Sequence, residues 1–201
     1  MGSINLKHTG SGSAITLSSD GTNLLLDGTA IGGGGGGSPD LYAENYDGTS
    51  TLPTATGTNA VALGDGSNAT GYKSFAAAIG NTYSSYGANG FGSVSIGLQS
   101  RANGTSSVAI GQNAKSEGTS SYAFGGYANY TYSTSLGYKA RAEAIDATAI
   151  GNSLASGTDS FAAAITNNTT SYGATGANSI AIGTLAKAAG SYSVALGNQA
   201  L

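Results

Sequence analysis

A five-residue motif, Ser107-Val108-Ala109-Ile110-Gly111, recurs with substitutions from residue 61 to residue 197. In every copy a small residue precedes a large apolar one. The small residues are Ala62, Ala78, Ser95, Ala109, Ala123, Ser135, Ala149, Ala164, Ala181 and Ala195. The large ones are Leu63, Ile79, Ile96, Ile110, Phe124, Leu136, Ile150, Ile165, Ile182 and Leu196. Successive copies lie 12 to 17 residues apart, and such a repeat is typical of a solenoid.

The alternation of large and small residues has the period of a β-strand. Such a short strand is stable only when the next repeat stacks on it. Stacking in register places Ile110 between Ile96 and Phe124, about 4.8 Å from each. The small face must meet either the opposite wall of a narrow coil or another chain. The expected packing positions, in the core or between chains, are Ala62, Ala109, Ala181, Ala195, Ile96, Ile110 and Ile182.

A second, weaker element lies between the motifs, as in Arg101-Ala102-Asn103-Gly104. Each coil therefore has two short strands and two glycine turns, which is enough for a flat, two-walled roll. A longer duplication is also present, because residues 75–97 and 161–183 align without gaps. Within these copies we expect residues 82–90 and 168–176 to form bulges that project from the roll.

The pattern Ser-Val-Ala-Ile-Gly, then Ala-x-Ala-x-Gly, then Ser resembles the YadA-like head repeat of trimeric autotransporter adhesins. The resemblance covers residues 59–201. It implies an all-β fold, a left-handed parallel β-roll of about ten coils, in a side-by-side homotrimer. It also implies an adhesive or structural role at a surface.

The remaining sequence predicts two further regions. Residues 1–31 contain three short strand-like segments, 4–6, 14–17 and 23–26, and are expected to form a small β unit. Short repetitive β segments of this kind resemble units of phage tail and appendage proteins, which implies docking or assembly with other virion proteins. Residues 32–58 form a Gly-rich linker and an acidic neck. The six glycines 32–37 are either flexible or packed closely where three chains meet an axis. The repeat domain then covers residues 59–201.

Composition excludes several classes of function. Only 8% of the 201 residues are charged and 34 are Gly, against about 25% and about 7% in average proteins. The absence of Cys rules out disulfides and thiolate metal sites. A net charge of −3 argues against binding nucleic acid. His8 is the only histidine, so no catalytic, metal or cofactor site is expected and the protein is predicted not to be an enzyme.

Four basic residues occupy one position of the repeat, four places after the motif glycine: Arg101, Lys115, Arg141 and Lys187. Stacking aligns them on one face, which must be exposed because like charges repel. This row serves either solubility and edge protection or contact with an anionic surface polysaccharide. Tyr83, Tyr86 and Tyr172, in the two bulges, are further candidates for contact with a host or glycan, although packing between chains explains them equally well.

No signal peptide, long apolar segment or heptad pattern is visible. The leading interpretation is therefore a non-enzymatic tail or appendage fibre of a phage virion, which contacts a host polysaccharide or outer-membrane protein. The alternative is the excised head of a bacterial trimeric autotransporter adhesin, located at the cell surface. A polysaccharide-degrading fibre enzyme is a third hypothesis, and a plain structural spacer would have the same sequence features.

Overall fold

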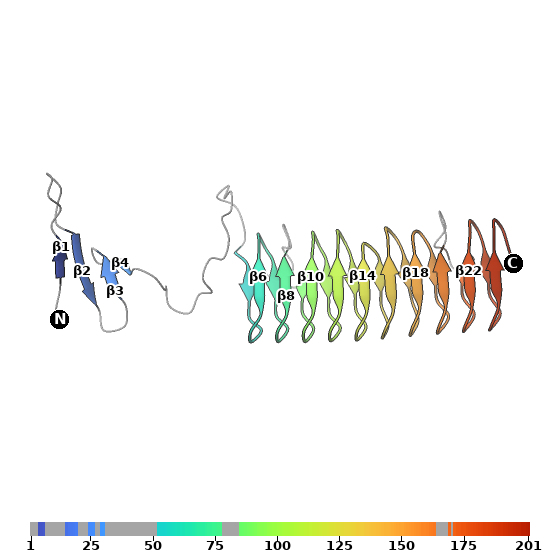
Figure 1. Ribbon diagram of the computed structural model, residues 1–201, viewed down its shortest axis with the longest axis horizontal. Helices are drawn as coiled ribbons and strands as arrows, with labels where there is room; N and C mark the ends of the chain where they lie inside the picture. Colours follow the sequence, from blue (N-terminus) through green and yellow to red (C-terminus); the bar gives the residue numbers. More distant parts are fainter. Residues whose placement is uncertain are drawn as a thin grey trace. The chain divides into compact units, whose positions relative to one another are not determined.

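The computed structural model describes residues 52–77, 85–163, 169 and 171–201, together with the backbone of four strands near the N-terminus. The chain divides into two units, Met1–Ala43 and Glu44–Leu201. Figure 1 shows the described elements of both units, and each of them is a β-strand. The expected linker at residues 32–37, most of the neck, His8 and Tyr83 lie outside the described residues.

The first unit contains an antiparallel sheet in the order β1-β2-β3-β4. Its strands are β1 (Ile4–Leu6), β2 (Ile15–Ser19), β3 (Leu24–Leu26) and β4 (Thr29–Ala30). Neighbouring strands in sequence are neighbours in the sheet. The sequence predicted three strands here, and β4 is additional.

The second unit is a stack of coils that forms two parallel ten-stranded sheets. The sheet of three-residue strands, here called the long-strand sheet, consists of β6 (Val61–Leu63), β8 (Phe75–Ala77), β10 (Val94–Ile96), β12 (Val108–Ile110), β14 (Tyr122–Phe124), β16 (Thr134–Leu136), β18 (Thr148–Ile150), β20 (Phe161–Ala163), β22 (Ile180–Ile182) and β24 (Val194–Leu196). Because sequence neighbours alternate between the two sheets, every coil contributes one strand to each wall (Figure 1).

The opposite wall, here called the short-strand sheet, consists of two-residue strands. They are β5 (Thr54–Ala55), β7 (Asn68–Ala69), β9 (Gly87–Ala88), β11 (Arg101–Ala102), β13 (Lys115–Ser116), β15 (Tyr127–Ala128), β17 (Arg141–Ala142), β19 (Leu154–Ala155), β21 (Gly173–Ala174) and β23 (Lys187–Ala188). Since β5 already pairs with β7, the stack begins before residue 59, the start of the repeat domain expected from the sequence.

The expected stacking register is confirmed at the motif itself. Ile110 pairs with Ile96 on one side and with Phe124 on the other. Ala109 pairs in the same way with Ser95 and Ala123. The alternation of large and small residues therefore forms continuous columns along the stack.

The interior of the roll is filled by alanine and serine. Ala109, Ala123 and Ala149 in the long-strand sheet are fully buried, as are Ala102 and Ala142 in the short-strand sheet. The two walls approach so closely that the Oγ atoms of Ser95 and Ser100 lie 2.7 Å apart across the interior. The sequence left two explanations for the small residues, contact with the opposite wall of the coil or contact with another chain. In the single chain these residues already pack against the opposite wall of the same coil.

The serine that begins the motif closes a turn. Ser93 Oγ donates a hydrogen bond to the Gly90 carbonyl at 2.8 Å, and Ser121 Oγ donates to the Gly118 carbonyl at 2.7 Å. The backbone N–H of each serine bonds to the same carbonyl. The residue before each serine has a positive φ, such as 51° at Ser120, as the third position of a tight turn requires.

The predicted register is wrong by two residues at two repeats. β8 pairs Phe75 with Val61 and Ala77 with Leu63, so Ala76 rather than Ala78 faces the interior. Likewise, Ala162 in β20 takes the position predicted for Ala164. A run of three alanines offers several small positions. At the first of these two repeats the preceding serine favours the observed register, because Ser74 Oγ donates a hydrogen bond to the Gly71 carbonyl at 2.7 Å.

The bulge prediction is also wrong for part of each segment. Gly87-Ala88 and Gly173-Ala174 are strands β9 and β21 of the short-strand sheet. Ala88 and Ala174 are fully buried, so residues 87–90 and 173–176 are core elements and do not project. Residues 78–84 and 164–168 lie outside the described residues.

Candidate functional site

The two outer faces of the roll differ in chemistry. The long-strand sheet points large apolar side chains outward, including Ile96, Ile110 and Ile182, and Ile182 is 40% exposed. Ala109, Ala181 and Ala195 point inward and are buried, whereas Ala62 is partly buried against the first interior cluster. The outer face of the short-strand sheet instead carries charged and polar side chains.

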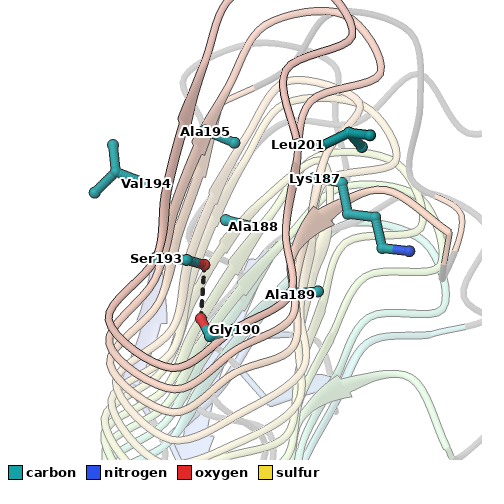
Figure 2. Close-up of a pocket in the computed structure, with 8 residues that line it drawn as sticks. All are labelled: Lys187, Ala188, Ala189, Gly190, Ser193, Val194, Ala195 and Leu201. Carbon is teal, nitrogen blue, oxygen red and sulfur yellow. Dashed lines mark hydrogen bonds between the residues drawn. The ribbon is translucent and has the colours of Figure 1, made fainter.

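Figure 2 shows this division at the last coil, where Val194 and Lys187 lie on opposite outer sides while Ala188 and Ala195 lie between the walls. The hollow drawn there, about 320 Å³, is lined by Lys187 and by interior and turn residues such as Ala188, Ala195 and Gly190. This hollow lies where the interior of the roll opens at the last coil, and Lys187 has the only charged side chain in its lining. We therefore do not take it as the functional site.

The basic residues named from the sequence lie in one column of the short-strand sheet. Arg101 pairs in register with Lys115, and Tyr127 stands between Lys115 and Arg141. Leu154 and Gly173 occupy the next two coils before Lys187. Only Arg101 and Lys115 are therefore direct neighbours in this column.

Three of the four cations are paired with carboxylates that were not among the residues predicted from the sequence. Arg101 forms an ion pair with Glu117, and Lys115 Nζ lies 3.6 Å from Glu117 Oε1. Arg141 donates two hydrogen bonds to Glu143 Oε1, at 2.9 Å from Nε and 2.6 Å from Nη2. The expectation of a row of mutually repelling charges is thus corrected for Arg101, Lys115 and Arg141, whose side chains are only 22% to 36% exposed and carry counterions.

A polar ladder runs beside this column, one position beyond each interior residue. Thr70 Oγ1 lies 2.7 Å from Asn89 Oδ1, and Asn89 Nδ2 donates to Asn103 Oδ1 at 3.0 Å. Asn103 Nδ2 in turn donates to Glu117 Oε2 at 3.5 Å. The ladder ends on the carboxylate that also faces Arg101 and Lys115. It therefore links four successive coils to the cation pair.

A shallow hollow of about 270 Å³ opens over the two neighbouring cations. Its lining consists of Tyr86, Gln99, Arg101, Asn113, Ala114, Lys115 and Tyr127. At one end Gly87 pairs with Arg101 and has no side chain to fill the column. Toward the other end, Gly125 and Gly126 lead directly into Tyr127, without the two residues that lie between Gly111 and Ala114 in the preceding coil. We take this hollow as the candidate site.

Three of the residues named from the sequence thus come together: Arg101, Lys115 and Tyr86. Arg141 and Lys187 lie in the same column but do not line the hollow, and Tyr172 is half-buried outside it. Gln99, Asn113, Tyr127 and Glu117 were not among the predicted contact residues. The signal for Glu117 and Glu143 was present, because each follows a cation by two residues on an extended segment and so shares its face.

The described residues contain no group of three or more His, Cys, Asp or Glu side chains placed to hold a metal ion. No helix in the described part of the chain is long and apolar enough to cross a membrane.

Comparison with known families gives one match. The model of the YadA head domain repeat (2 copies) matches residues 55–77, 88–114, 131–153 and 174–200, about half of the chain. These segments lie within the stack of coils and include strands of both sheets. Neither the curated proteins nor the solved structures contain a match.

Proposed function

Since the chain carries YadA head domain repeats, we propose that it is a non-enzymatic, homotrimeric structural or adhesive fibre. Three rolls would pack side by side and bury the outer face of the long-strand sheet. The observation that carries this proposal is the row of large apolar side chains that a single chain leaves in water. The polar face of the short-strand sheet would remain outside and meet the environment.

The apolar face is unusually continuous. It consists of two columns, of which nine members from six strands are between 36% and 62% exposed: Val61, Tyr122, Phe124, Leu136, Ile150, Ile180, Ile182, Val194 and Leu196. Monomeric proteins rarely expose contiguous apolar patches of this kind, and larger ones mark interaction sites. A second and a third copy of the chain are the proposed occupants, because the matched repeat is that of an adhesin head.

The two sides of the roll would then have separate roles. The small interior residues leave little apolar volume for a core within one chain, so association supplies burial that the single roll lacks. The outward cations, amides and tyrosines of the short-strand sheet are the proposed contact with a host surface polysaccharide or outer-membrane protein.

As the finer proposal, we place this fibre in a phage virion, as a tail or appendage component that docks through its N-terminal unit to other virion proteins. The small separate sheet of residues 4–30 and the acidic balance of residues 1–58 support a docking role. Mass spectrometry of purified virions tests this placement. Detection only on bacterial cells would favour the head of a surface adhesin, and release of reducing sugars from host envelopes would contradict a non-enzymatic role.

Sedimentation equilibrium tests the trimer. We expect three chains per particle for the unmodified protein, and dissociation or loss of assembly for Ile110→Asp, because the charge would be buried between chains without a partner. Thr119→Asp is the matched control, since Thr119 lies in an exposed turn, and it should remain trimeric. A folded monomer at micromolar concentration, with the unmodified sequence and native circular dichroism, would refute the trimer.

A further inference from the structure

We infer that the hollow over Arg101 and Lys115 binds a carboxylate-bearing saccharide. The inference deepens the proposed contact with a host surface and rests on it. Arg101 and Lys115 share one counterion, Glu117, whereas Arg141 has Glu143 to itself. The hollow therefore keeps an excess positive charge, and the neighbouring part of the column does not.

Lys115 keeps a hydrogen-bond donor for a ligand. Lys115 Nζ lies 3.6 Å from Glu117 Oε1, in range for an ion pair but too far for a hydrogen bond. Arg101 Nε is buried and has no hydrogen-bond partner within the described part of the chain. Because Arg101 Nε has almost no accessible surface, a carboxylate in the hollow would accept a charge-assisted hydrogen bond from Lys115 Nζ, and Arg101 would contribute its positive charge. Such hydrogen bonds are among the stronger polar contacts in proteins.

Most of the other residues that line the hollow are amides or tyrosines. Gln99 and Asn113 place side-chain amides beside the cations, and an amide both donates to and accepts from sugar hydroxyls. Tyr86 and Tyr127 lie at the two ends of the hollow along the stack, where their rings offer amphipathic contact surfaces. Four successive coils contribute, about 14 Å from first to last at ordinary strand spacing, so a short oligosaccharide would lie along the stack.

The duplicated half of the chain does not repeat this chemistry. At the positions that align with Tyr86, Gln99 and Arg101 stand Tyr172, Leu185 and Lys187. An amide is replaced by an apolar side chain, and Leu201 aligns with Lys115. Among the described residues the inferred site therefore occurs once, and in the proposed trimer three copies would act together on a repetitive polymer.

Titration calorimetry of the full chain with tetragalacturonate tests the inference, with maltotetraose as the neutral probe. We expect binding of the acidic probe only. Lys115→Gln should weaken it about tenfold, the loss of one charge-assisted hydrogen bond. Lys73→Gln makes the same charge change in a turn on the other edge of the roll, where Lys73 lies over the Tyr72 ring, and should leave affinity unchanged.

Glu117→Gln separates binding from a merely structural role. Removing the internal carboxylate should strengthen binding of tetragalacturonate severalfold, whereas a residue needed only for folding would weaken it. Thermal unfolding of each variant verifies that the fold is intact. Equal affinity for both probes, or equal binding by Lys115→Gln and the unmodified chain, would overturn the inference.

Sedimentation and whole-cell binding of the same samples keep the two proposals apart. A trimer that adheres to host cells but does not bind the acidic probe would overturn the saccharide site alone. A monomer would refute the proposed assembly while leaving the calorimetry interpretable, because every residue of the hollow belongs to one chain.

Discussion

Single residues in this roll are selected mainly by the space between neighbouring backbones. The walls face each other across alanine and serine, so an interior position such as Ala109 has no room for a larger side chain. Glycine is required at some positions by a second constraint, which is the short distance between the backbones of successive coils. A Cβ atom added at Gly104 would lie 1.9 Å from the carbonyl oxygen of Gly118 in the next coil. The stacking distance itself therefore requires glycine there.

Gly104→Ala tests this constraint. The atom that the new methyl group would meet is backbone, so the coil must shift, and we expect a loss of about 1–3 kcal/mol in unfolding free energy, as for other overpacked sites. Gly190→Ala is the matched control, because Gly190 holds the same position in the last coil and its nearest neighbour would be Ser193 Cβ at 3.7 Å. Chemical denaturation measures both. A loss at Gly190 equal to that at Gly104 would contradict the argument.

At the scale of elements, the sequence predicted the long strands well because their alternation is strong. The column of Ile96, Ile110 and Phe124 follows directly from the motif. The register of Phe75–Ala77 did not follow, since three successive alanines fit the small position equally and only the hydrogen bond of Ser74 distinguishes them.

The candidate site could be predicted only in part. Periodicity places Arg101 and Lys115 in one column, because equal spacing from the motif glycine gives equal positions in the coil. The hollow forms because two groups are absent from these coils. Gly87 has no side chain, and Gly125 is followed directly by Gly126, without the two turn residues that the preceding coil has at this place. Gaps of this kind have no residue signature of their own. To predict that Glu117 is shared by Arg101 and Lys115, one would need to know that the residues after each short strand also face outward.

The polar ladder offers a test at this scale. Asn103→Asp replaces the amide that donates to Glu117 with a second carboxylate one coil away. Like charges at this spacing are destabilising, and we expect a loss of about 0.2–1 kcal/mol that shrinks in high salt. Asn198→Asp adds the same charge at an exposed turn residue and should change stability little. A loss at Asn103 that does not depend on salt would show that the missing hydrogen bond, rather than repulsion, is responsible.

At the scale of the stacked unit, stability should be a sum over coils and their interfaces. Every coil offers the same two ladders to its neighbours, so the stack has no single nucleus on which all other parts depend. One coil differs from another mainly in its outward side chains. Removing a complete coil should therefore preserve the fold, provided that each remaining strand stays in its own wall.

Two deletions test this expectation. Deleting residues 98–111 joins Gly97 to Gln112 and removes one complete coil, so the walls keep their identity, and we expect a folded trimer of slightly lower stability. Deleting residues 98–104 joins Gly97 to Thr105 and leaves a turn of the same Gly-x-x-Ser form. The local turn is acceptable in both proteins, so turn formation alone does not distinguish them.

The shorter deletion moves every following long strand into the opposite wall. Val108 and Ile110 would then lie in the column of the short-strand sheet, and the apolar face would be split between the two sides of the roll. We expect aggregation or failure to trimerise, measured by sedimentation beside circular dichroism. If the half-coil deletion assembles as well as the full-coil deletion, the segregation of apolar and polar faces does not determine assembly, and the proposed trimer loses its main support.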